Sequence, residues 1–112
     1  MGGRGCGMTD RELLEAAAKA ADLPNMRIEA GGAVRYSYAP EHGFVSWNPL
    51  TDSGDALRLM VSLRMNVHLD SNMVDVDPDG ISWFSEAYGA NPYAATRRAI
   101  VRAAAEIGKE MK

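Results

Sequence analysis

The sequence contains one cysteine, Cys6, and only two histidines among its 112 residues. A disulfide within the chain is therefore excluded, and so is a zinc site built from several cysteines. No apolar run approaches the roughly 20 residues that cross a bilayer, and no charged start followed by an apolar stretch suggests a signal peptide. We expect a soluble intracellular protein that does not associate with membranes.

The sequence also lacks a large excess of either charge, because 12 lysines and arginines nearly balance 15 acidic residues and the net charge is −3. Such a balance indicates neither a strongly basic nucleic-acid binder nor an acidic mimic. The distribution is uneven: residues 65–86 contain five acidic side chains and no lysine or arginine, whereas residues 87–112 contain five basic and two acidic ones. We expect these two segments to neutralise each other within the fold.

The length allows one domain. Residues 1–7 contain four of the eleven glycines, and a regular element there would carry a heavy entropic cost. We expect a disordered leader, either an upstream-start extension or an expression remnant. Residues 8–112 are expected to form the single domain.

Three helices are predicted from their capping residues. Thr9 and Glu12 form a capping box that begins a helix over residues 10–21. Thr51 or Asp52 caps a second helix that continues to about residue 64, and Asn91 caps a third with a proline at its first position. Because the second helix has only a narrow polar edge, we expect it to be the central one and more buried than the first.

Six short strands are predicted from alternating patterns and turn residues, three before the second helix and three after it. Hairpin-sized connections join most of them, which favours antiparallel pairing. The predicted fold is therefore an α/β/α layered sandwich with a mainly antiparallel sheet and the order α-βββ-α-βββ-α. We expect Ile100 and Leu57 to be buried anchors of its core.

Three segments of the sequence are similar to a known family. They are Thr9-Asp10-Arg11-Glu12-Leu13-Leu14, Trp47-Asn48-Pro49-Leu50-Thr51-Asp52 with the helix that follows it, and the alanine- and arginine-rich residues 95–108. Together they resemble the phage ABA sandwich domain family over most of the chain. The resemblance implies a sheet between helical layers and an origin in a phage or prophage, hence the cytoplasm of a bacterial host. It implies no catalytic residues.

The acidic segment also matches the pattern of a calcium loop, with acidic side chains at Asp75, Asp77, Asp79 and Glu86 and a glycine at the sixth position. A calcium loop of this type needs a helix on each side, and the flanking patterns here indicate strands. We therefore interpret the match as a hairpin turn and predict no metal site or cofactor.

Neither His42 nor His68 lies near a motif that would complete a catalytic triad or a zinc site. Arg97, Arg98 and Arg102 share one face of the third helix and are a candidate nucleic-acid patch. Because no aromatic residues interleave with them, we favour a solvated helix face.

Trp47, Asn48 and Asp52 lie at a corner between a strand and a helix, where binding groups often gather. Capping and tryptophan packing explain the same residues without a ligand, and we favour that account. The sequence thus predicts a non-enzymatic accessory protein that binds a protein partner or itself; the alternative is a nucleic-acid-binding module that uses the third helix.

Overall fold

Antiparallel hairpins and three helices make up the computed structural model, which describes residues 9–78 and 83–111. The first half contains α1 (Asp10–Ala21), β1 (Arg27–Ile28), β2 (Val34–Tyr36), the short 3-10 helix η1 (Pro40–His42) and β3 (Val45–Trp47). The second half contains α2 (Ser53–Ser62), β4 (Asn66–Leu69), β5 (Met73–Asp77), β6 (Phe84–Ala87) and α3 (Pro92–Lys109). The predicted mixed fold with the order α-βββ-α-βββ-α is confirmed. The leader expected over residues 1–7 lies outside the described residues.

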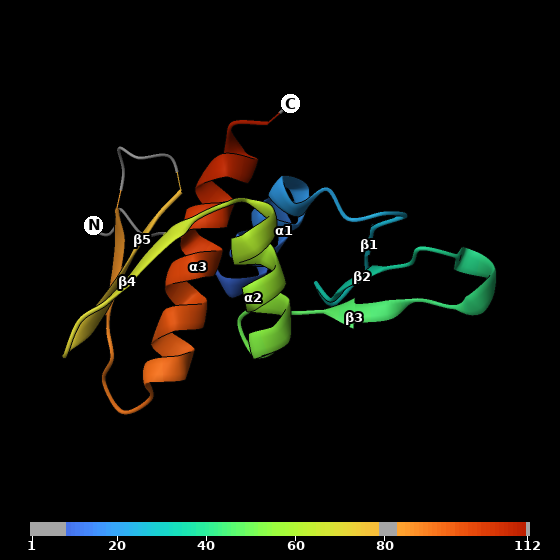
Figure 1. Cartoon of the computed structure of the whole chain (residues 1–112). Coiled ribbons are helices and arrows are strands. Elements are labelled where there is room, and N and C mark those ends of the chain that lie inside the picture. The colour runs from blue at the N-terminus through green and yellow to red at the C-terminus, as the bar shows by residue number, and fades with distance from the viewer. Residues whose placement is uncertain (1–8, 79–82, 112) are drawn as a thin grey trace.

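The six strands form two separate antiparallel sheets, in the orders β1-β2-β3 and β4-β5-β6. Figure 1 shows the first sheet extending away from the helices, while the second lies against α3. All three helices lie on the same side of the second sheet (Figure 1). The pattern of β5 explains this arrangement, because Val74 and Val76 are fully buried whereas Asp75 points to the opposite, polar face.

The central helix is α3, which contacts α1, α2, β5 and β6. Alanines dominate its buried positions and allow close approach, and Ile100, with 4% of its surface exposed, is its large anchor. The expectation that the second helix is central and more buried than the first is wrong. Six residues of α1 are buried, against Asp55, Ala56 and Leu59 in α2.

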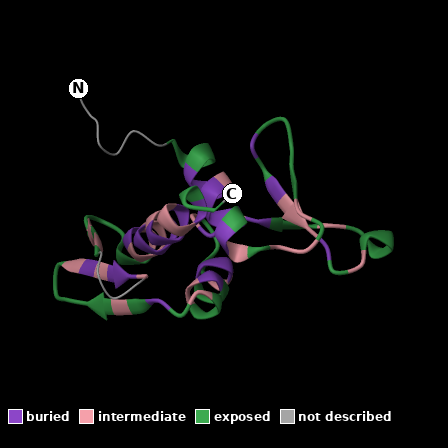
Figure 2. Cartoon of the chain, turned by 90° about the horizontal axis from the view of Figure 1, so that it is seen from above, coloured by how far each residue is buried: buried purple, intermediate pink, exposed green. Residues whose placement is uncertain are grey.

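Leu57 is 56% exposed, so its predicted role as a buried anchor is also wrong. The reason lies in the packing of α2, which turns Ala56 and Leu59 toward the core and leaves the adjacent face uncovered. Figure 2 shows the same contrast, with buried residues concentrated where α1 and α3 meet and exposed residues over much of the first sheet.

Candidate functional site

The corner between β3 and α2 is held by hydrogen bonds that need no ligand. Trp47 is buried in the core. The backbone N–H of Asn48 donates to Oδ2 of Asp55 at 2.9 Å, and Oδ1 of Asn48 accepts from the backbone N–H of Leu50 at 3.0 Å. These contacts fix the direction in which the chain enters α2.

Asp52 is the N-cap of α2, because its Oδ1 accepts from the backbone N–H of Asp55 at 2.9 Å. Asp55, in the first turn of α2, is itself buried and accepts from Arg58 at 2.8 Å. That hydrogen bond raises the pKa of Arg58. The corner residues Trp47, Asn48 and Asp52 are thus all engaged in holding the fold.

Two of the three arginines of α3, Arg98 and Arg102, pair with acidic residues on other elements. Arg98 donates to Oδ1 of Asp10 in α1 at 3.0 Å. Arg102 donates to Oε2 of Glu86 in β6 at 2.6 Å, and also to the backbone oxygen of Ser85. The pair between Arg102 and Glu86 joins the basic segment, residues 87–112, to the acidic segment, residues 65–86. These two arginines therefore tie α3 to its neighbours instead of presenting a free basic face.

The acidic residues of the calcium pattern are distributed over two paired strands. Asp75 and Asp77 belong to β5, Glu86 belongs to β6, and Asp79 lies outside the described residues. The hydroxyl of Ser85 donates to Asp75, and Arg102 pairs with Glu86. Within residues 9–78 and 83–111, no three histidine, cysteine or acidic side chains are grouped so that they could hold a metal ion.

The two histidines lie apart. His42 ends η1, and the ring of His68 on β4 contacts the indole of Trp83 edge to face, with 5.1 Å between their centres. The contact occupies the outer face of the second sheet.

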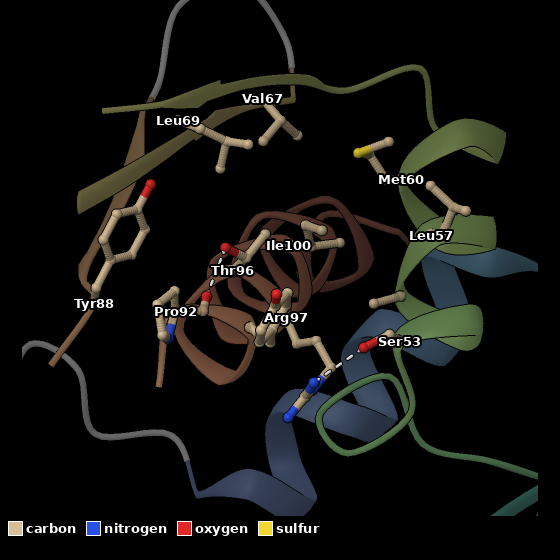
Figure 3. A pocket seen from close by; sticks show the side chains of 12 residues that line it. Ser53, Leu57, Met60, Val67, Leu69, Tyr88, Pro92, Thr96, Arg97 and Ile100 are labelled. Atoms are coloured by element: carbon tan, nitrogen blue, oxygen red, sulfur yellow. Dashed lines mark hydrogen bonds between the residues drawn. The ribbon is translucent and has the colours of Figure 1, made fainter. Parts of the chain in front are cut away.

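An apolar groove opens between α2 and β4, with α3 as its floor (Figure 3). Its volume is about 680 Å³, within the range of small-molecule pockets. The residues that line it are Ser53, Ala56, Leu57, Met60, Val67, Leu69, Tyr88, Pro92, Tyr93, Thr96, Arg97 and Ile100. This site was not foreseen from the sequence, which placed Leu57 in the core.

Two large aliphatic side chains on facing walls of the groove are more than half exposed. Leu57 on α2 is 56% exposed and Leu69 on β4 is 67% exposed. In Figure 3, Leu69 and Val67 point from β4 toward the floor, and Met60 points across from α2. The signal in the sequence was the surplus of large apolar residues in α2, more than one buried face accommodates.

One cation lies at the edge of this groove. The Nε of Arg97 donates to the backbone oxygen of Leu50 at 2.9 Å, and its Nη1 donates to Oγ of Ser53 at 3.0 Å (Figure 3). Both acceptors are neutral, and no carboxylate of a described residue pairs with Arg97, in contrast to Arg98 and Arg102. A guanidinium has five N–H groups, so three of those on Arg97 are left for another acceptor.

Comparisons of the chain with protein-family models, with curated proteins and with solved structures gave no match. Among the described helices, none combines the length and the apolar character needed to cross a membrane.

Proposed function

We propose that this chain is a non-enzymatic accessory protein that binds a partner protein in the groove between α2 and β4. The observation that carries the proposal is the exposure of Leu57 and Leu69 on its facing walls. Apolar surface gathered in a concave site is typical of an interaction site. The partner contributes an apolar segment with an acidic side chain, because the groove is apolar and Arg97 at its edge forms no ion pair with a described residue.

The resemblance to the phage ABA sandwich domain family supports a phage or prophage origin and action in the cytoplasm of the bacterial host. The genes that flank the coding sequence test this part. Phage structural or integration genes on either side are expected. Housekeeping genes on both sides would contradict it.

A peptide-display selection tests the binding proposal. Twelve-residue random peptides are selected on the wild-type protein, and one enriched peptide is labelled for fluorescence anisotropy. We expect enriched peptides to combine apolar residues with an acidic one, and L57S and L69S each to weaken binding more than tenfold. The matched control is Val45→Ser, because Val45 is 52% exposed on the other sheet and does not line the groove.

Four results would count against the proposal. A selection without enriched peptides, or binding that is unaffected by L57S and L69S, would remove the groove as the site. A concentration-dependent dimer in sedimentation, lost in L57S, would make a second copy the occupant. Tight binding of a labelled DNA duplex that weakens steeply with salt would favour the nucleic-acid alternative.

A further inference from the structure

In the part of the chain that the structure describes, the edge of the second sheet that borders the groove is open. The strand order β4-β5-β6 gives β4 one neighbouring strand among the described residues. An edge strand presents unpaired N–H and C=O groups, and proteins often protect such edges with lysine or proline. The residues of β4, Asn66, Val67, His68 and Leu69, include neither.

The register shows which backbone groups face outward. The N–H of Asp70 donates to the oxygen of Met73 at 2.9 Å, just beyond the paired residues. Hydrogen-bonded pairs alternate along an antiparallel ladder, so the next such pair is His68 with Asp75. The backbone N–H and C=O of Val67 and Leu69 therefore point away from β5, toward the open edge.

The same two residues line the groove with their side chains. Val67 and Leu69 thus offer hydrogen-bonding groups along the open edge and apolar surface beneath it. A strand added beside β4 would satisfy both at once, because its own side chains alternate between the groove and the outer face. A helix in the groove would cover the apolar side chains and leave the backbone groups of the edge unpaired.

We infer that the partner segment binds as an extended strand that adds to β4 as the fourth strand of the sheet. Its side chains at every second position enter the groove between Leu57 and Leu69, and an acidic side chain at one end reaches Arg97. This inference rests on the proposed function and specifies the conformation of the segment that the groove takes. Four to six residues suffice, since β4 is four residues long.

Amide hydrogen exchange with the selected peptide tests the inference. At saturating peptide, we expect the amides of Val67 and Leu69 to exchange at least tenfold more slowly, because they gain carbonyl partners. The matched control is the amide of Ile28 in the edge strand β1, whose exchange is expected to stay unchanged. The second measurement uses peptides methylated at single backbone nitrogens. We expect methylation at alternate positions to weaken binding more than tenfold and methylation between them to have little effect.

The outcomes separate the two proposals. A peptide that L57S displaces, yet that leaves exchange at Val67 and Leu69 unchanged and shows no alternation on methylation, would overturn strand addition and leave the proposed function standing. Failure of every peptide to bind in the groove would overturn both. Slow exchange at Val67 and Leu69 without peptide, in a concentration-dependent dimer, would replace the partner with a second copy.

Discussion

The backbone oxygen of Ala16 in α1 lies where a side chain on Gly108 of α3 would begin. A Cβ built on Gly108 would stand 1.7 Å from that oxygen, far inside any atomic contact. Because Gly108 has no side chain, the backbones of α1 and α3 approach each other closely where the helices cross. This crossing joins α1 to the central helix. Ala17 of α1 and Ala104 and Ala105 of α3 are also buried in the core.

Gly108→Ala is therefore expected to destabilise the protein, even though alanine favours helix over glycine by about 1 kcal/mol. Overpacking of this kind costs about 1 to 3 kcal/mol or more, because backbone has to move. The control is Gly31→Ala, where a Cβ would meet no atom within 4 Å. Urea denaturation measures both. Equal free energies of unfolding for G108A and the wild type would contradict the crossing described.

Ile100→Ala is expected to lower the free energy of unfolding by about 2 to 5 kcal/mol, because Ile100 belongs to the buried core and only 4% of its surface is exposed. Leu57→Ala is expected to change it by about 0.5 kcal/mol or less, because most of that side chain already meets solvent. Thermal or urea denaturation of the two variants compares them. A large loss in L57A would place Leu57 in the core after all.

The pair between Arg102 and Glu86 is expected to contribute more to stability than the pair between Arg98 and Asp10. The side chains of the first pair are 32% and 23% exposed, and those of the second are 40% and 67% exposed. Double-mutant cycles to alanine should give a coupling of about 1 kcal/mol for the first pair and less than about 0.5 for the second. The reverse order would mean that β6 is not held to α3 by this contact.

Asp55→Ala is expected to destabilise the protein more than Asp52→Ala. Removing the Asp55 carboxylate leaves the N–H of Asn48 without its acceptor and releases Arg58, at about 1 to 3 kcal/mol. Removing the Asp52 cap costs about 1 kcal/mol. The midpoints of thermal unfolding compare the two variants. A lower midpoint for D52A than for D55A would show that capping dominates at this corner.

Millimolar calcium is expected to leave the thermal midpoint unchanged. Asp75 and Glu86 lie on paired strands and are engaged by Ser85 and Arg102. A calcium loop at a hundred times its dissociation constant would add about 2.7 kcal/mol to the free energy of unfolding. A rise of that size, absent in D75N, would require the two strands to rearrange around an ion.

Local signals in the sequence were sufficient for the starts of the helices and the order of elements. The capping box of Thr9 and Glu12 has both of its hydrogen bonds, and Asn91 accepts from the first two amides of α3 after its proline. The glycine pair placed the hairpin between β1 and β2 in the same way, since Gly32 adopts the positive φ that this tight turn requires. These features depend on neighbours within a few residues, which the sequence contains directly.

The tertiary structure alone decided which apolar faces are covered. The pattern of α2 shows that Ala56, Leu57 and Leu59 are apolar, but only the placement of α2 beside α3 buries Ala56 and Leu59 and leaves Leu57 at the groove. Likewise, the partners of Arg98 and Arg102 are 88 and 16 residues away in sequence, beyond the reach of any local pattern. A periodic pattern fixes which residues share a face of an element; which of those faces meets another element depends on packing between distant segments of the chain.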